Sequence, residues 1–418
     1  MNTLKRTLAL VATLAMSATA FASCGDTESS STSTASSSST VEESSEAEES
    51  SEAEESSEAE ESSEAESSEA TESTGELDAS VATGGDVFTV AAWNADDVPY
   101  LIAQWKGLDA EAVADNSADS SINFINFGVG GGDAAEKYDN LFKSGDDLDV
   151  YFCEADWALK YINDDERTLP LSKDDEKTLA LDKLGLGDSD FENIYPYTDE
   201  IGKDSNGVRK GVSWQAAAGG FYYRSDLAKE YLGVEDPEAM QEKIGDWDKF
   251  VAAAKEVSDK SSGKTALADT LGGRRQANAS GRTTPWVVDN KLQIDAFCED
   301  FANTAKELWD CGGITKNSQW SDEWTAAGTN DSCMGYFVST WGFGGFALTA
   351  AGGEGGATYG NWAVCEGPQP FFWGGTWIVV NPKTDNGEEA RDFIISATSD
   401  EDQMSAYATS KPEYVNNS

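Results

Sequence analysis

Aromatic, acidic and amide side chains follow two apolar segments early in the chain. Trp93, Asn94 and Asp96 come after the first segment, and Glu154 and Asp156 come after a later one. Aromatic rings stack on the apolar C–H faces of a sugar, and carboxylate or amide oxygens accept hydrogen bonds from its hydroxyl groups. The same residues also fit a structural role, in which the indole packs in a core and the acids cap helices. Both interpretations stay open from these residues alone.

These side chains need elements that bring them together. Residues 87–93, 122–127 and 149–153 are predicted as buried strands, because each is short and largely apolar. The glycines at 130–132 form a turn between the second and third strands, and Asp133 can cap a helix there. Strands that alternate with helices indicate a parallel sheet covered by helices. The predicted fold class is therefore α/β, and ligands of such sheets bind beyond the carboxyl ends of the strands.

The composition excludes several classes of function. The 418 residues include no histidine, which excludes a Ser-His-Asp triad, a Cys-His dyad and a His-ligated zinc site. The formal net charge of −48 argues against a nucleic-acid partner, which needs a basic surface, and favours a monomer. No CxxC pair indicates a metal site. We therefore predict no catalytic residue, no metal and no cofactor.

Residues 1–23 are typical of a secretory signal. Two basic residues, Lys5 and Arg6, precede a short apolar run, which is too short to span a bilayer. The segment that ends in Cys24 resembles a bacterial lipobox, although it has Phe21 where leucine is usual. We expect Cys24 to be lipidated and to anchor the chain on the membrane; ordinary cleavage near Ala22 is the alternative.

Residues 24–78 are predicted to be a disordered tether. The segment consists mostly of Ser, Thr, Glu and Ala, and residues 43–66 repeat the hexad Glu-Ser-Ser-Glu-Ala-Glu. A period of six fits no helix or heptad, and like charges keep such a chain extended. Its expected function is to hold the folded part away from a membrane or through a wall; a partner-binding acidic repeat is the alternative.

Several later segments occur in an order that carries more information than any one of them. They are Gly211–Leu227, Ile244–Ala254, Met334–Trp341, Trp373–Pro382 and a predicted helix at 388–395. This order resembles the extracellular solute-binding proteins of carbohydrate ABC transporters, the group related to maltose-binding protein, over residues 86–414. The resemblance implies two α/β lobes joined by hinge strands, a carbohydrate ligand, permease subunits as partners and a place on the extracellular face of the cytoplasmic membrane. Lobe 1 would comprise 79–211 and 366–418, and lobe 2 would comprise 212–365.

The resemblance also implies which residues bind the ligand. Asp156 matches an acceptor of sugar hydroxyls and Trp341 matches a stacking tryptophan, while Trp373 could supply a second platform. Trp214 falls at the first crossing, where the maltose binder has a carboxylate, and Trp286 is a weaker candidate. The expected set is Trp93, Asn94, Asp96, Glu154, Asp156, Trp214, Trp286, Trp341 and Trp373. Trp247 and Trp309 are expected in the core.

Other functions remain open from the sequence. A glycoside hydrolase needs two carboxylates across one bond, but Glu154 and Asp156 lie two apart at a strand end and point to opposite sides. A glycan-binding adhesin would have an open groove instead of a closing cleft. A binder of peptide or polyamine would keep the fold but change the ligand, and the acidic surface would suit a cation. The basic cluster Arg274, Arg275 and Arg282 fits a solvated loop, transporter docking or an acidic sugar.

Two further expectations concern the cysteines and the end of the chain. Cys298 and Cys311 flank one predicted helix and cannot pair while it is intact. Cys333 could reach Cys365, although nothing in the sequence supports that pair. The family usually continues with further helices, so the end at Ser418 means a truncated or a short member.

Overall fold

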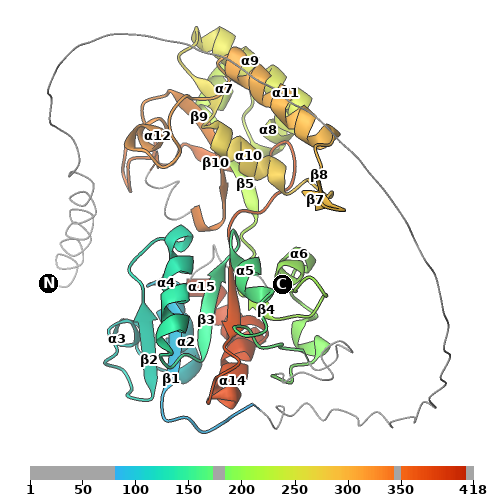
Figure 1. Cartoon of the computed structure of the whole chain (residues 1–418). Helices are drawn as coiled ribbons and strands as arrows, with labels where there is room; N and C mark the ends of the chain where they lie inside the picture. The colour runs from blue at the N-terminus through green and yellow to red at the C-terminus, as the bar shows by residue number, and fades with distance from the viewer. Residues whose placement is uncertain (1–80, 173–183, 343–349, 411–418) are drawn as a thin grey trace, which may run out of the picture. The chain divides into compact units, whose positions relative to one another are not determined.

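The computed structural model describes residues 81–172, 184–342 and 350–410 (Figure 1). By its contacts the chain divides into a unit of residues 1–69 and a unit of residues 70–418, and every described residue belongs to the second. The predicted signal at 1–23, Cys24 and the tether at 24–78 lie outside the described residues. Among the residues described, no helix is long and apolar enough to cross a membrane.

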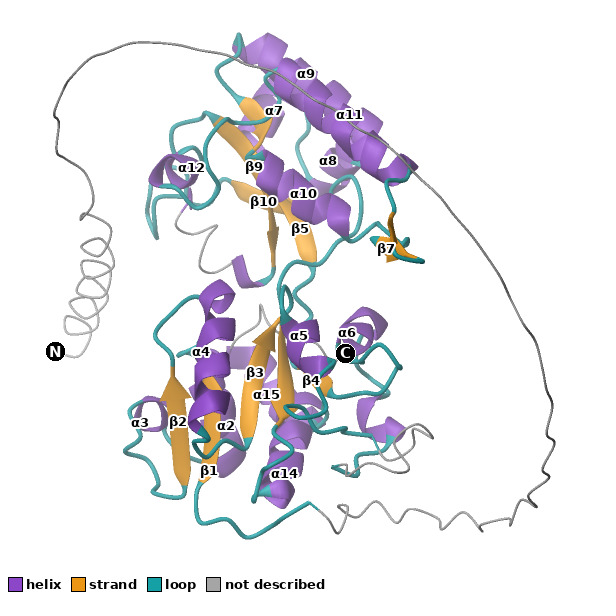
Figure 2. Cartoon of the chain, in the orientation of Figure 1, coloured by secondary structure: helices purple, strands orange, loops and turns teal. Residues whose placement is uncertain are grey.

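The first sheet contains five strands in the order β2-β1-β3-β11-β4 (Figure 2). The three strands predicted early in the chain are confirmed as β1 (Phe88–Ala92), β2 (Ile122–Asn126) and β3 (Val150–Glu154). β1 is parallel to β2 and β3, as expected. β11 (Thr376–Val380) is antiparallel to both β3 and β4 (Gly211–Ser213), because the chain enters it from the second sheet instead of through a covering helix.

Helices cover both faces of this sheet. They are α2 (Asp97–Lys106), α3 (Ala110–Ala114), α4 (Gly131–Ser144), α5 (Ala158–Ile162), the 3-10 helix η2 (Asp188–Phe191), α6 (Pro196–Ile201), α14 (Gly387–Thr398) and α15 (Glu401–Ser410). One core joins Val90, Phe152, Phe393 and Tyr407, and a second lies around Tyr138 and Trp377. The predicted helix at 388–395 is thus confirmed within α14.

The second sheet contains four strands in the order β10-β5-β9-β6. Its strands are β5 (Gly219–Arg224), β6 (Ala266–Ala268), β9 (Cys333–Ser339) and β10 (Trp362–Cys365). Its helices are α7 (Ser225–Leu232), α8 (Pro237–Ile244), α9 (Trp247–Ser261), α10 (Leu271–Ala279), α11 (Ala296–Asp310) and α12 (Asp322–Ala326). The strands β7 (Val287–Val288) and β8 (Lys291–Leu292) form an exposed hairpin between α10 and α11.

The chain passes between the two sheets twice. It leaves the first sheet after Ser213 and returns at Thr376, and an isolated bridge joins Ala218 to Phe372 where the two passing segments meet. Val212, where the sequence placed the start of the second lobe, lies in β4 and pairs with Ile378 of the first sheet. The second sheet is therefore a continuous insertion between β4 and β11.

The cysteines of the described residues are unpaired. Cys298 lies in the first turn of α11 and Cys311 follows its last residue, so the prediction that this helix keeps them apart is confirmed. Cys333 and Cys365 are also free.

Candidate functional site

Three tryptophans from separate parts of the chain form a cluster, which we call the aromatic cluster: Trp320, Trp341 and Trp373. The ring centroids of Trp341 and Trp373 are 5.2 Å apart, with an interplanar angle of 81°. Trp320 lies 6.0 Å from Trp341 and 5.6 Å from Trp373. Trp341 and Trp373 are half-buried, so part of their ring surface remains accessible. The sequence predicted two of these three rings as ligand contacts.

The strand β9 and the returning segment hold two rings of the aromatic cluster. Trp341 follows the end of β9, and its Nε1 donates to the carbonyl of Trp373 at 2.7 Å. The Ser339 hydroxyl donates to the same carbonyl at 3.0 Å. The next two residues, Gly374 and Gly375, have φ values of +76° and +104°, a region that only glycine enters without strain. The turn toward β11 therefore depends on these glycines.

Trp320 was not predicted, and it is the most exposed member of the aromatic cluster. Its side chain is 55% exposed and its backbone φ is +72°, which is a strained conformation for a bulky residue. The buried ring of Trp324 lies 4.8 Å away, and its Nε1 donates to the buried carboxylate of Asp269 at 2.8 Å. Trp320 directly precedes Ser321, which caps α12, so a helix-start signal marks its place but not its partners.

Glu154 and Trp341 both lie close to Gly374. A side chain at Gly374 would have its Cβ 3.3 Å from Trp341 Nε1 and 3.7 Å from Glu154 Oε1. Burial raises the pKa of the Glu154 carboxyl to about 7, although the Asp156 N–H donates to it at 2.8 Å. A half-buried carboxyl of this kind titrates near neutral pH and can donate or accept a hydrogen bond.

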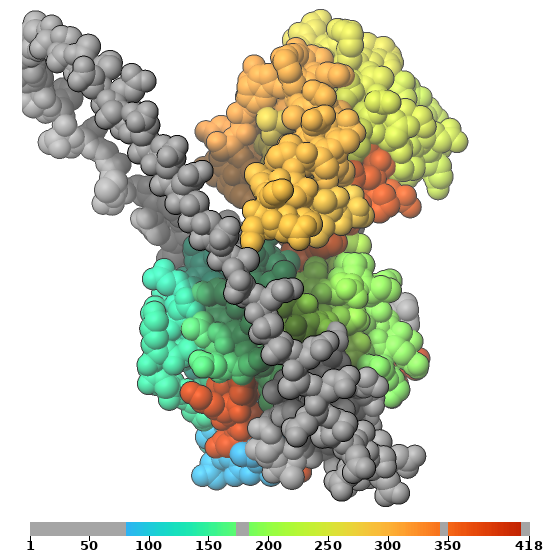
Figure 3. Space-filling model, turned by 45° about the vertical axis from the view of Figure 1, so that its right-hand side comes forward, coloured from blue at the N-terminus to red at the C-terminus, as the bar shows by residue number. Residues whose placement is uncertain are grey.

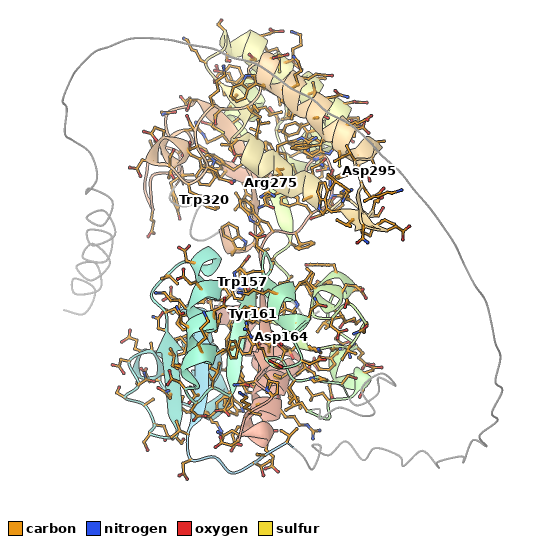
Figure 4. The ribbon with its side chains drawn as sticks, viewed as in Figure 1. Trp157, Tyr161, Asp164, Arg275, Asp295 and Trp320 are labelled. Atoms are coloured by element: carbon orange, nitrogen blue, oxygen red, sulfur yellow. The ribbon has the colours of Figure 1, made fainter. Side chains whose placement is uncertain are left out.

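Trp93 and Trp157 form a second aromatic pair beside Glu154. Their ring centroids are 5.6 Å apart in an edge-to-face arrangement, and Trp157 Nε1 donates to the Gly131 carbonyl at 2.9 Å. A Cβ on Gly131 would lie 2.9 Å from Trp93 Nε1 and 3.3 Å from Glu154 Cγ. Glycine at the start of α4 therefore allows the helix to approach both side chains. Figure 4 shows Trp157 near the end of β3.

The polar residues predicted with them have different surroundings. Asn94 lies two residues before the N-cap residue of α2, Asp96, and holds the start of this helix: its Oδ1 accepts from the Asp97 N–H at 2.8 Å and its Nδ2 donates to the Asp97 carboxylate at 2.8 Å. The sequence left a capping role open for the acids, and the structure gives this role at the start of α2 to the Asn94 side chain instead. Asp96 and Asp156 are exposed in the loops that follow β1 and β3. The structure thus brings Glu154 together with Trp93, Trp341 and Trp373.

Trp214 does not lie where a ligand can reach it. It is 0% exposed in the core of the first sheet, where its Nε1 donates to the Tyr407 hydroxyl at 3.2 Å. Its ring packs edge-to-face on Phe152, with centroids 5.3 Å apart. The prediction of Trp214 as a ligand contact is corrected for this reason: the residue after β4 points into the core instead of toward the crossing.

Two other tryptophans lie apart from the aromatic cluster. Trp286 is 58% exposed beside the β7–β8 hairpin, with the Arg282 guanidinium 3.8 Å from its ring centre. Trp309, which we expected in the core, is 42% exposed on α11. Trp247 does pack against the core of the second sheet.

One cluster of three aspartates among the described residues has carboxylate oxygens close enough together to hold a cation. Asp147, Asp149 and Asp385 have ligand atoms within 4.8 Å of one another. Asp149 already accepts from the Thr89 N–H and from the Thr384 hydroxyl, so it joins β1, β3 and the segment after β11. We assign it a structural role and no metal.

The family of bacterial extracellular solute-binding proteins matches residues 110–412. This match covers most of the chain and includes the whole second sheet, the first sheet except β1, and both rings of the Trp341–Trp373 pair. The chain belongs to the family of bacterial extracellular solute-binding proteins. No curated protein sequence matches it.

Solved structures support the fold. A family 1 extracellular solute-binding protein superposes with a TM-score of 0.64 at 17% identity, covering 80% of each chain. The sugar-binding protein MalE of Xanthomonas citri gives 0.56 at 16% identity over 79% of each chain. The galacto-N-biose-/lacto-N-biose I-binding protein of Bifidobacterium longum, in complex with lacto-N-biose, gives 0.55 at 15% identity over 75% of each chain. The chain therefore has the two-lobed α/β fold of these binding proteins.

Proposed function

We propose that this protein captures a sugar or oligosaccharide outside the cell, without chemical change, and delivers it to the permease of an ABC transporter. The observation that carries the proposal is the aromatic cluster beside Glu154, at the place where the chain returns from the second sheet. Membership in a solute-binding family supports it, as do the sugar-binding proteins that share the fold.

The proposed binding mode uses stacking and hydroxyl recognition together. Trp341, Trp373 and Trp320 would supply apolar faces for sugar rings, and Glu154, which lies close to Gly374, would accept a hydrogen bond from a sugar hydroxyl. Trp93 would extend the surface on the side of the first sheet. The flexible pair Gly374–Gly375 would permit the lobes to close, so that ligand binding favours a closed arrangement that the permease recognises.

The proposal includes the expected position of the protein at the cell surface. Lipid on Cys24 would anchor the chain on the extracellular face of the cytoplasmic membrane, and residues 24–78 would hold a monomeric binding unit away from it. The crossing segments support a first lobe built from residues before Ser213 and after Thr376.

Glu154 also favours one competing function. A glycosidase needs a carboxylic acid with a raised pKa as its general acid, and the pKa of Glu154 is about 7. Its nearest acid in sequence, Asp156, is exposed, and the backbone N–H of Asp156 donates to the Glu154 carboxylate. Hydrolysis of a labelled oligosaccharide by the full chain would establish an enzyme and refute simple capture.

A titration tests the proposal directly. The intrinsic tryptophan fluorescence of the full-length chain is recorded against a panel of mono- and oligosaccharides, with small-angle scattering at saturation. We expect a saturable change and a more compact particle with one class of sugar. Binding without compaction would favour an adhesin, and a folded chain that responds to no sugar would refute carbohydrate binding.

A further inference from the structure

A cavity of about 420 Å³ opens between α10, the segment that precedes β7 and the start of α11. The aromatic rings of Trp286, Phe297 and Phe301 form its apolar walls, and Arg275 and Arg282 contribute the charged side chains. The cavity is large enough for one pyranose ring. Figure 3 shows the surface of this part of the chain in yellow and orange.

The charge of this cavity is opposite to that of the whole chain. Its lining includes two arginines and no carboxylate, whereas the protein has 77 acidic residues against 29 basic ones. Three other cavities in the described part of the chain each include at least one aspartate in their lining. A basic lining without acids favours an anionic group of a ligand.

Arg282 is held in place by its neighbours. Its side chain is 6% exposed and its guanidinium lies 3.8 Å from the centre of the Trp286 ring. The Nη2 group donates to the Gln293 carbonyl at 2.9 Å, and the Asp295 carboxylate is 3.6 Å away. The buried Nε finds no hydrogen-bond partner among the described residues. One half-buried acid, Asp295, thus faces a guanidinium that has further donors to offer.

Arg275 connects the cavity to the aromatic cluster. Arg275 is exposed on α10. Both Arg275 and Trp320 belong to the part of the chain that is built around the second sheet (Figure 4). In the amide orientation that satisfies its neighbours, the Gln276 carbonyl accepts from Arg275 Nη2 at 3.1 Å and from Trp373 Nε1 at 3.3 Å. One side chain therefore contacts both a cavity arginine and a ring of the proposed sugar site.

We propose that the cavity binds the carboxylate of an acidic sugar unit, such as a uronate, whose neighbouring unit stacks on Trp373. This inference rests on the proposed function and names its substrate class: an anionic oligosaccharide. The planar guanidinium of Arg275 matches a carboxylate with two parallel hydrogen bonds, and the exposed face of Trp286 covers the sugar ring.

The test compares acidic sugars with their neutral counterparts. Calorimetry on the full-length chain uses oligogalacturonides, glucuronate-bearing xylo-oligosaccharides and sialyllactose, each beside its carboxyl-reduced form. We expect one acidic ligand to bind at least about 10-fold more tightly than its reduced form, since a charge-assisted hydrogen bond adds that much. The preference should shrink as salt is raised.

Variants identify the source of the preference. Arg275→Gln should weaken the acidic ligand about 10-fold to 100-fold and leave the reduced form within about 2-fold. Arg282→Gln provides a second variant, and unchanged circular dichroism shows that each is folded. The control is Lys255→Gln, which removes the same charge from an exposed side chain of α9.

The outcomes separate this inference from the proposed function. Tight binding of a neutral sugar, with no preference for any acidic form, would overturn the acidic-sugar inference and keep sugar capture. An acidic preference unchanged in both arginine variants would also overturn the assignment to this cavity. A folded chain that binds none of the ligands, acidic or neutral, would refute sugar capture and with it the inference.

Discussion

The indole nitrogen of Trp341 donates to the backbone carbonyl of Trp373 at 2.7 Å, across a sequence separation of 32 residues. This contact joins the end of β9 to the segment that returns to the first sheet. The ring that offers a stacking face therefore also fixes the backbone of its neighbour, which leads directly into Gly374 and Gly375. The proposed sugar site and the passage between the sheets therefore share one hydrogen bond.

Trp341→Ala should therefore reduce carbohydrate affinity by more than one lost stacking face. We expect a loss of at least about 10-fold, because the substitution also removes one of the two hydrogen bonds to the Trp373 carbonyl and the edge-to-face contact with the Trp373 ring. Calorimetry measures it. Trp309→Ala removes an exposed indole of α11 and is the matched control; an equal loss in both variants would contradict the prediction.

Trp214→Phe should lower the stability of the protein and leave its ligand affinity unchanged. The variant removes the donor to the Tyr407 hydroxyl from a fully buried ring, so the free energy of unfolding should fall by about 2 kcal/mol. Ligand affinity of the folded variant should be unchanged. Urea unfolding and calorimetry check the two halves, and lost affinity in a stable variant would return Trp214 to the ligand site.

Trp320 permits a test that separates backbone strain from ring contact. Its φ of +72° suits glycine better than alanine. Trp320→Gly and Trp320→Ala should lose ligand affinity equally, since both lack the ring. The glycine variant should be the more stable one by roughly 1 kcal/mol, because alanine keeps the strained backbone. Thermal unfolding of the pair decides, and greater stability of the alanine variant would show that this φ is not strained.

Glu154 should give the stability of the protein a pH dependence near neutrality. Its pKa is about 7 in the folded chain and 4.5 in the reference state, so the native state keeps a proton that the unfolded state loses between those values. Stability should therefore fall by about 1–2 kcal/mol as pH rises through this window. Glu154→Gln should remove that fall.

The control for this measurement is Asp156→Asn, which removes an exposed carboxylate two residues away. Unfolding in urea between pH 4.5 and pH 7.5 compares the three proteins. A slope in Glu154→Gln as steep as in the unchanged chain would assign the pH dependence to another group.

The fold could be predicted because its strands are short apolar runs with clear ends. The resemblance to solute-binding proteins, rather than the pattern of the strands, pointed to Trp341 and Trp373 as ligand contacts, and the structure places the two rings side by side. Trp214 also follows a short apolar strand, but this position does not tell which side of the sheet its side chain faces. Successive side chains of a strand point to opposite sides, so a shift of one residue decides between the core and the crossing segment. Trp320 lies in an irregular loop without periodicity, and only the tertiary contacts with Trp324, Trp341 and Trp373 reveal it.

The position of β11 also has a consequence for synthesis on the ribosome. β11 is an inner strand of the first sheet, between β3 and β4, yet it is made after the entire second sheet. The inserted second lobe has all its strands as soon as Cys365 has emerged, while the first lobe still lacks a central strand. The later-made lobe can thus complete its folding first. The first lobe, whose other four strands are made earlier, must wait with an open sheet for residues 376–380.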